Sequence, residues 1–328
     1  MTTQRSLQVV LAAGFTTVQD LGRKGFRSLG VPVSGALDRL SAVYANALVG
    51  NEPASPVIEV IGSLAVKFGV DTVVAVAGGY PRVFLNDVEV RPWNPIYCSR
   101  GSVLRVVPSG VGYVHYIAVS GGVVCDKVLG SASTYVRGGM GCLGRTLKYG
   151  DVLEIGLTDV VDVWGRVSDL KPPQQLVEIH SSIGKDALTL RATEGIHSSL
   201  LSDVDVLLRG EYVVSAESDR MGYRLEGESL GSAKGLGRLP STPTDRGYVQ
   251  VPPDGKPIVL MSDAQTTGGY AVALHVVPPD VDLLAQLSPG RRVRFKLVSI
   301  EEAEQEVRRY LDELEKPRLI REELEYWG

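Results

Sequence analysis

The sequence predicts a mainly β protein with two β domains and a few short helices. Glycine and proline contribute 37 and 18 of the 328 residues, a share typical of chains with many tight turns. Short valine-rich runs bounded by Gly, Pro, Asp or Asn recur through both halves without regular intervening helices. This spacing favours closed or sandwiched β-sheets over a doubly wound α/β fold.

The strands are predicted from short apolar runs. The clearest runs are 71–77, 102–107, 113–120, 206–208, 258–261 and 292–298. Near the N-terminus, Leu7, Val9 and Leu11 alternate with other residues as in a strand, and Gln8 interrupts the apolar stretch. We therefore expect a first strand there and not a signal peptide.

Three segments have helical spacing of apolar residues. The first is 37–49, with Ser34 or Gly35 just before it and Gly50 at the C-terminal stop position. The other two are a short helix over 279–287 and an amphipathic helix over 300–315 that ends before a proline. We interpret the last one as a packing helix.

A proline-containing stretch at 167–175 is the predicted linker. It separates an N-terminal β domain, residues 1–167, from a C-terminal β domain, residues 176–300. A helical extension covers 301–328. Each domain is long enough to bury a core of its own.

Composition excludes several functional classes. A net charge of −4 gives no reason to expect nucleic acid or a membrane surface as a partner, and no apolar stretch approaches the ~18 residues of a membrane span. Three cysteines, an odd number, argue against a disulfide framework and favour a reducing, cytoplasmic compartment. The four histidines lack metal-like spacing, so no metal site is expected. The glycine run 139–144 matches a dinucleotide fingerprint but opens no helix.

Four loops combine glycines with charged or hydrogen-bonding side chains. They span 18–38, 135–141, 215–224 and 262–270. In the first loop, Arg23, Arg27 and Ser34 can present cations and backbone N–H groups to an anion. The alternative is that Ser34 caps a helix and the glycines only form turns. Four such loops, split between the halves, favour one composite cleft at the domain junction.

These loops carry a family resemblance over about residues 9–298. The matching segments are 17–23, 30–38, 46–51, 131–139, 218–225, 250–255 and 265–270. They resemble the biotin-dependent carboxyltransferase, or allophanate hydrolase subunit 2, family, which includes the C subunit of 5-oxoprolinase, the antagonist of the sporulation-kinase inhibitor and the urea carboxylase carboxyltransferase half. The resemblance implies two cyclophilin-like β-barrels and a partner from the subunit 1 family, and it leaves open a lactam-utilisation protein as a further partner.

The resemblance also implies chemistry on a small amide or lactam. We expect a subunit of an ATP-dependent 5-oxoprolinase-like amidohydrolase that converts 5-oxoproline to glutamate, with ATP used together with the partner subunit. One alternative is a carboxyltransferase subunit that moves a carboxyl group between carboxybiotin and urea or a related amide. No Met neighbours a Lys here, so biotin would reside on a separate carrier protein. The other alternative is a non-catalytic regulatory subunit that binds a kinase inhibitor.

Candidate site residues come from the same loops. Asp38 and Asp263 are candidate acid/base or ordering groups, and Arg220 is the third catalytic candidate. The alternative for each aspartate is a cap or a turn. The candidate substrate-binding residues are Gln19, Arg23, Ser34, Arg137, Gln265, Thr266, Thr267, Gly268, Gly269 and Tyr270. The family pattern differs at 244–249, Ala264 and Ala271, which bears on substrate identity and not on the fold.

Overall fold

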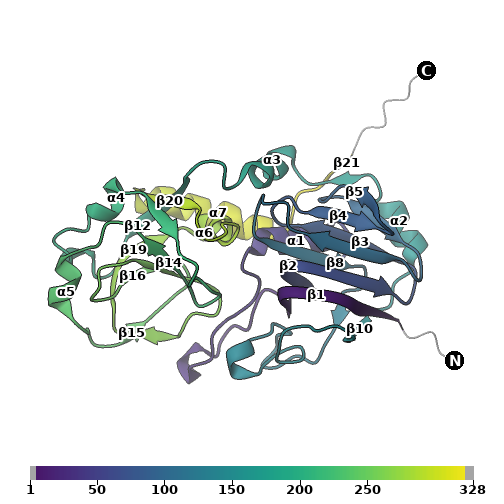
Figure 1. The fold of residues 1–328 in the computed structure, drawn as a ribbon, viewed down its shortest axis with the longest axis horizontal. Helices are drawn as coiled ribbons and strands as arrows, with labels where there is room; N and C mark the ends of the chain where they lie inside the picture. Colours follow the sequence, from purple (N-terminus) through teal and green to yellow (C-terminus); the bar gives the residue numbers. More distant parts are fainter. Residues whose placement is uncertain (1–4, 322–328) are drawn as a thin grey trace, which may run out of the picture. The chain divides into compact units, whose positions relative to one another are not determined.

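The computed structural model describes residues 5–321, which form two compact units (Figure 1). The first unit comprises the chain up to Gly22, Arg39–Ser182 and the chain from Glu313. The second comprises Arg23–Asp38 and Ile183–Asp312. The units are therefore discontinuous in sequence, which a single division at 167–175 does not describe. In particular, residues 23–38, which we call the strap, belong to the second unit.

The first unit is built on one ten-stranded sheet. Its strands are β1 (Ser6–Gln19), β2 (Val57–Phe68), β3 (Thr72–Ala77), β4 (Arg82–Leu85), β5 (Val88–Val90), β6 (Pro95–Cys98), β7 (Val103–Val107), β8 (Val114–Val119), β9 (Val123–Val124) and β10 (Val152–Ile155). The sheet branches at β2: its first half pairs with β8, its second half pairs with β7, and its other edge pairs with β1. Figure 1 shows β1, β2, β8 and β3 side by side.

Long strands cross closely at one glycine pair. β1 and β2 pair in antiparallel fashion from Leu7 to Gln19, with a shift of register between Val9 and Leu11, and Gly14 lies opposite Gly62. A Cβ on Gly14 would lie 2.2 Å from the Ile61 carbonyl oxygen, so only glycine fits this crossing. The buried strands β3 and β8 supply much of the core, because all their residues are buried.

Helices of the first unit cover and flank this sheet. They are α1 (Arg39–Ala47), α2 (Val160–Val167) and α3 (Gln174–Ser182), with the 3₁₀ helix η2 (Val136–Gly138) in the loop before β10. α1 lies against β8 and β3. The short strands β11 (Leu170–Lys171) and β21 (Ile320–Arg321) pair with each other. The stretch predicted as a linker, 167–175, contains the end of α2, β11 and the start of α3, and the predicted domain bounds stay a prediction.

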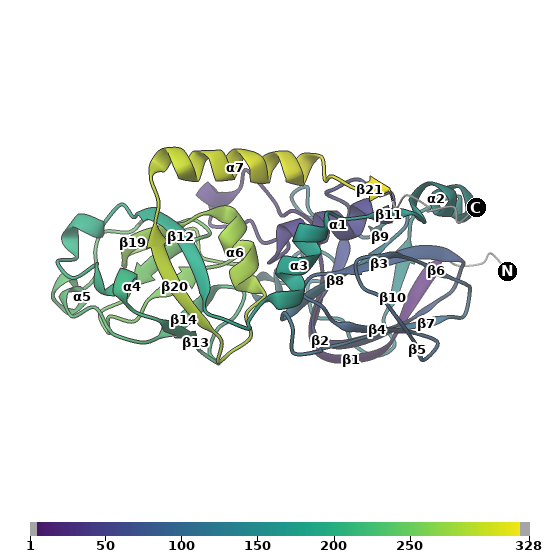
Figure 2. The same cartoon turned by 90° about the horizontal axis from the view of Figure 1, so that it is seen from above.

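The second unit contains a closed seven-stranded barrel. Around the barrel the strands are β12 (Leu188–Glu194), β19 (Ala271–Val276), β16 (Tyr248–Val251), β17 (Ile258–Leu260), β14 (Gly222–Glu226), β13 (Tyr212–Val214) and β20 (Arg292–Leu297). β15 (Thr242–Pro243) and β18 (Thr267–Gly268) form a separate small ladder. The other elements are η1 (Arg27–Leu29), η3 (Ser198–Leu200), α4 (Val206–Arg209), α5 (Ser232–Leu236), α6 (Pro278–Ala285) and α7 (Ile300–Glu315). α6 contacts β12 (Figure 2).

The mainly β prediction is confirmed, and most of the predicted strands and all three predicted helices are present. The strand predicted at 206–208 was wrong, because this segment is α4, closed by local bonds such as Gly210 N–H to the Val206 carbonyl. Three apolar residues are too few to distinguish the two periodicities. None of the helices in residues 5–321 is long and apolar enough to cross a bilayer. The predicted helical extension beyond residue 321 lies outside the described residues.

The odd number of cysteines argued against a disulfide framework, but one disulfide is present. Cys125 and Cys142 form a disulfide, with their Cα atoms 5.4 Å apart, and Cys98 is a buried free thiol. The three cysteines are one bonded pair and one buried thiol, so an odd number does not exclude a disulfide. A separation of 17 residues gave no signal of proximity, because the loop between β9 and β10 brings the two cysteines together.

Candidate functional site

The strap is held in the second unit by side chains that arrive from four different segments. The Gly35, Ala36 and Leu37 carbonyls accept hydrogen bonds, and so does the Asp38 carboxylate. The donors are Arg220 Nη2 to Gly35 (2.7 Å), Ser262 Oγ to Ala36 (3.1 Å), Arg246 Nη2 to Leu37 (2.7 Å) and Gln286 Nε2 to Asp38 Oδ2 (2.7 Å). Four consecutive strap residues are thus fixed, each by one side chain.

Arg220 and Asp263, two of the candidate catalytic residues, form a bidentate ion pair. Arg220 Nε lies 2.8 Å from Asp263 Oδ2 and Nη2 lies 3.1 Å from Oδ1. Both side chains are buried, at 6% and 8% exposed. The Asp263 N–H also donates to the Arg220 carbonyl. Because Arg220 additionally binds the Gly35 carbonyl, the geometry favours a positioning role for this pair.

A second buried ion pair joins Arg246 and Asp282, neither of which was among the candidate residues. Arg246 Nη2 lies 2.7 Å from Asp282 Oδ1, and the Tyr310 hydroxyl donates to Asp282 Oδ2 at 2.9 Å. Burial alone would lower the pKa of Arg246, but Asp282 outweighs it and the pKa is raised. Arg246 therefore remains charged and holds Leu37. No local motif predicts such a long-range contact.

Ser34 is not the cap of a helix. It is fully buried in a left-handed conformation (φ 56°), followed by Gly35 (φ 88°), and α1 begins only at Arg39. Its Oγ forms no hydrogen bond with any residue in the described part of the chain. A non-glycine residue in this conformation is strained, which is typical of functional or tightly constrained positions. Arg23 is also buried, and its N–H donates to the Val33 carbonyl, closing the strap on itself.

The 265–270 loop forms a hydrogen-bonded cluster with neighbouring barrel residues. Gln265 Nε2 donates to Gln250 Oε1 at 3.1 Å, and Thr244 binds the Gln265 carbonyl through Oγ1. The Thr244 N–H donates to the Thr266 carbonyl. Thr267 and Gly268 form β18, and Gly269 accepts a bond from the Leu239 N–H. Ala271 begins β19 directly after Tyr270.

Gln250 was missed among the candidate residues, although its place in the strand β16 between two valines is a signal. It is 2% exposed, and its Nε2 has no hydrogen-bond partner among residues 5–321. A Cβ on Gly268 would lie 2.6 Å from this nitrogen. Gly268 is not in the left-handed region, so a side chain here would meet the end of the Gln250 side chain and would not disturb a turn.

Of the candidate residues, only Gln19 and Arg137 lie in the first unit. Gln19 Nε2 donates to Thr17 Oγ1 (2.9 Å) and to the Thr134 carbonyl (3.0 Å). Arg137 is exposed in η2, at the tip of the loop that Gln19 supports. The composite cleft stays a prediction.

Asp20, next to Gln19, organises the base of that loop. Its carboxylate accepts bonds from Ser131 Oγ (2.6 Å), Ser133 Oγ (2.5 Å), the Ala132 N–H (2.8 Å) and the Gly22 N–H (2.7 Å). The two serine hydroxyls are donors here, so this carboxylate fixes the loop and does not face a substrate.

Two buried histidines lie in the first unit. His115 Nδ1 is 2.7 Å from the Gly78 carbonyl, which makes it a donor, and burial lowers the pKa of His115 to about 4. His180 Nδ1 accepts the Gly79 N–H at 3.2 Å, so its proton resides on Nε2, which faces Ser41 Oγ at 3.5 Å. A protonated Nε2 cannot take the serine proton, so the arrangement is not a nucleophile–base pair.

Arg220 and Ser34 do not fit a triphosphate. Arg220 Nε and Nη2 are occupied by Asp263 and by the strap, and Ser34 Oγ is fully buried. No cluster of three or more His, Cys, Asp or Glu side chains within 5–321 forms a candidate metal site. Arg220 and Ser34 are therefore not assigned to ATP.

A closed β-barrel joined to a branched sheet, with a strap clamped by two buried Arg–Asp pairs, defines the class to which this chain belongs. It matches the carboxyltransferase domain, subdomain A and B, over residues 29–297, and it is a member of that family. It is 35% identical over 328 residues to the C subunit of 5-oxoprolinase from Escherichia coli, covering 94% of this chain and 97% of that protein. It is 33% identical over 311 residues to the C subunit of 5-oxoprolinase from Haemophilus influenzae, covering 91% and 94%.

The fold is also similar to that of a solved enzyme. The crystal structure of the K. lactis urea amidolyase superposes with a TM-score of 0.84 at 27% identity, covering 95% of this chain. This chain spans only 20% of that longer protein. The mainly β architecture thus recurs in one part of a longer enzyme.

Proposed function

We propose that this chain is the subunit of a 5-oxoprolinase-like amidohydrolase that acts with a subunit 1 family partner to open 5-oxoproline to glutamate, with ATP used together with the partner. The observation that carries the proposal is the length of the match. The chain and the relatives named as the C subunit of 5-oxoprolinase cover each other almost completely, at 94% and 97% for the Escherichia coli protein. A lactam-utilisation protein is the further partner that the proposal includes.

The site supports binding of a cyclic amide by Gln250 and Gln265. Because Gln265 Nε2 donates to Gln250 Oε1, the pair retains a donor on Gln250 Nε2 and an acceptor on Gln265 Oε1. A lactam presents its C=O and N–H on one edge, so it needs one donor and one acceptor from the protein. Thr266 and Thr267 lie beside this pair in the sequence and are the further candidates for hydrogen bonds to the ring.

A carboxyltransferase role is the second candidate, favoured by the family match and by the urea amidolyase structure. In that case biotin would arrive on a separate carrier protein, and Gln250 and Gln265 would bind urea or a related amide, which also presents a C=O and an N–H. The two proposals therefore share the amide-binding residues and differ in the reaction partner.

The decisive experiment compares the purified chain with a co-expressed complex of the chain and its subunit 1 family partner. We expect ATP-dependent release of glutamate from 5-oxoproline by the complex and none by the lone chain, because the described residues contain no complete nucleophile–base pair. Robust turnover by the lone chain contradicts the proposal. Carboxyl transfer from carboxybiotin to urea, without glutamate release, supports the second candidate.

Variants of the amide pair refine this test. Gln265→Ala in the complex is expected to raise KM for 5-oxoproline while the complex still assembles. Gln8→Ala, at an exposed position of β1, is the matched control and leaves KM unchanged. An unchanged KM in the Gln265 variant would remove this pair from the site.

A cytoplasmic location is part of the proposal, and the Cys125–Cys142 disulfide makes it testable. Disulfides are rare in reducing compartments. Trapping of thiols in intact cells, followed by counting of alkylated cysteines, distinguishes a reduced cytoplasmic pool from an oxidised one.

A further inference from the structure

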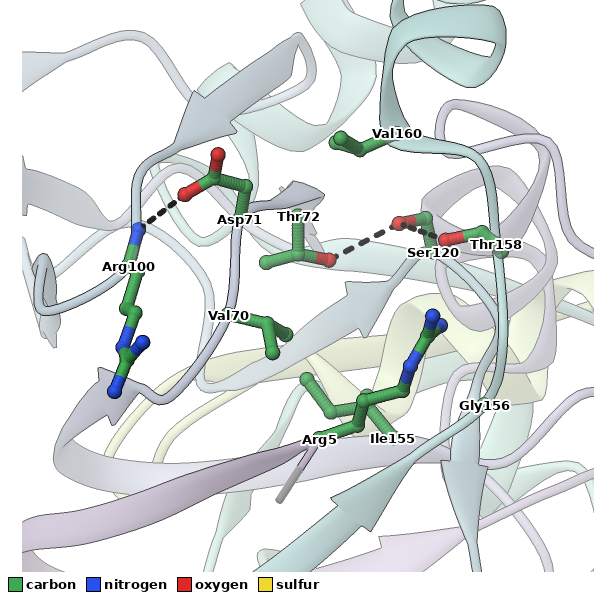
Figure 3. A pocket seen from close by; sticks show the side chains of 10 residues that line it. All are labelled: Arg5, Val70, Asp71, Thr72, Arg100, Ser120, Ile155, Gly156, Thr158 and Val160. Carbon is green, nitrogen blue, oxygen red and sulfur yellow. Dashed lines mark hydrogen bonds between the residues drawn. The ribbon is translucent and has the colours of Figure 1, made fainter. Parts of the chain in front are cut away.

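A cavity of about 450 Å³ opens in the first unit, and none of the candidate residues above lines it (Figure 3). It lies where several strands end: β3 begins beside it, and β8 and β10 end beside it. Mouths of β-sheet enclosures are common ligand sites, especially where a few polar groups converge on a partly apolar wall. Val70, Ile155 and Val160 supply the apolar wall.

Three hydroxyl groups form a row along one side of this cavity. Thr72 Oγ1 lies 3.0 Å from Ser120 Oγ, which lies 3.4 Å from Thr158 Oγ1 (Figure 3). Thr72 and Ser120 are 2% and 1% exposed, so the row is rooted in the protein interior. The Val73 N–H donates to Ser120 Oγ at 3.3 Å, which orients the middle hydroxyl.

The row can point its protons toward the cavity. When Thr72 donates to Ser120 and Ser120 donates to Thr158, the Thr158 hydroxyl has its proton available for a ligand. Chains of this kind polarise one another and strengthen the last donor. A negatively charged acceptor beside Thr158 favours this orientation of the three hydroxyl protons over the opposite orientation, in which Thr158 donates to Ser120.

Two arginines and one aspartate line the cavity, so its lining carries a net positive charge. The Arg5 backbone carbonyl accepts a bond from the Ile155 N–H, which anchors the residue, and its guanidinium extends to the side of Ser120 and Thr158 (Figure 3). Arg5 forms no ion pair with any residue from 5 to 321. Asp71 is the lining carboxylate, and it already accepts bonds from the Arg100 N–H (2.7 Å) and the Tyr97 hydroxyl (3.3 Å).

The helix that borders the cavity does not itself supply the attraction. The Asp159 carboxylate caps α2 by accepting from the Val161 and Asp162 N–H groups. The charge of the cavity therefore comes from Arg5 and Arg100, against the engaged Asp71.

We propose that this cavity is a binding site for a small oxyanion, the phosphate or carboxylate group of a metabolite, held by the Arg5 guanidinium and the Thr158 hydroxyl. The site is separate from the amide-binding residues and does not depend on the proposed function. Arg100, on the opposite rim, adds long-range attraction.

The test uses the full chain and two probes, inorganic phosphate and acetate, each titrated at an ionic strength matched with sodium chloride. Backbone amide NMR signals of Ser120 and Thr158 are expected to shift saturably. Binding of phosphate alone assigns a phosphoryl ligand, acetate alone assigns a carboxylate, and binding of both supports the shared chemistry. The absence of a saturable shift with either probe overturns the proposal.

Variants locate the binding. Arg5→Gln is expected to weaken binding about 10-fold or more, because it removes a charge-assisted hydrogen bond. Thr158→Val removes the hydroxyl with little change of shape and should weaken binding as well. Arg91→Gln, an exposed arginine of the same unit outside the cavity, makes the same change in charge and should bind normally. Equal affinity in the Arg5 and Arg91 variants would overturn the proposal; melting in chloride verifies that each variant is folded.

Discussion

Replacement of Arg220 by lysine should loosen the strap before it affects any chemistry. In the structure, the guanidinium makes two bonds to Asp263 and one to the Gly35 carbonyl. Lysine retains the charge but presents a single ammonium, which cannot reach both partners in the same geometry. The bidentate contact and the strap contact therefore cannot both persist.

The size of the effect follows from the burial of the pair. Hydrogen bonds to charged groups contribute roughly 1.5–3 kcal/mol each, and removing one partner of a buried pair costs about 3–5 kcal/mol. Arg220→Lys keeps one favourable contact with Asp263, so we expect a loss of about 2–3 kcal/mol. Arg220→Met leaves the Asp263 carboxylate without its cation and should approach about 3–5 kcal/mol.

The measurement must report on the second unit. Trp93 and Trp164 both lie in the first unit, so tryptophan fluorescence is unsuitable. Hydrogen exchange of the strap amides, followed by mass spectrometry, measures the local opening directly. Arg224→Lys is the matched control, because the Arg224 side chain is half exposed and its ion pair with Glu217 is long at 3.8 Å. An exposed pair of this kind contributes little to stability.

Strap amides are expected to exchange faster in Arg220→Lys and at the wild-type rate in Arg224→Lys. Wild-type strap exchange in Arg220→Lys, together with lost turnover of the assembled complex, would refute the positioning role and favour direct contact of Arg220 with substrate.

Three further predictions concern stability. His115 is neutral and buried with its pKa lowered from 6.5 to about 4, so the unfolded chain binds more protons between these values and stability falls as pH decreases through them, by about 2 kcal/mol at pH 5. His115→Asn should flatten this part of the urea-denaturation profile; an unchanged slope would contradict the assignment. Gly268→Ala should destabilise by about 1–3 kcal/mol, and much less in a Gln250→Ala background, because the clash is with the Gln250 amide; additive effects would argue against it. Denatured, unreduced chain should show one free thiol, and removal of the Cys125–Cys142 bridge should cost about 3 kcal/mol, whereas three thiols would exclude the bridge.

Local patterns in the sequence predicted what local physics determines. Short apolar runs bounded by turn residues identified strands such as β7 and β20, and the amphipathic stripe identified α7 with its observed bounds. The errors have two causes. At 206–208 the apolar run was too short to show a period, and at 125 and 142 the pairing depends on a loop whose path is set by tertiary contacts.

The candidate site was predicted as a set of loops rich in polar residues, and in the structure the polar side chains of these loops form hydrogen-bonded clusters. Their partners were not predictable, because the decisive contacts join residues about 200 positions apart, such as Arg220 to Gly35 and Arg246 to Leu37. An arginine beside a glycine-rich loop has the same local pattern whether it binds a ligand or a distant carbonyl. Only the fold distinguishes the two.

The strap contacts also distinguish residues whose hydrogen-bonding groups are already used within the protein from residues that still have a group available for a ligand. Asp38, Arg220 and Asp263 use their hydrogen-bonding groups on one another, on Gln286 and on the strap. A group that is already satisfied gains little from a ligand, since binding must first break its existing bonds. Gln250 Nε2 has no such bond within 5–321, and the amide of a substrate would supply one. We therefore expect amide recognition at β16 and the 265–270 loop, whereas Asp38, Arg220 and Asp263 hold the strap in place.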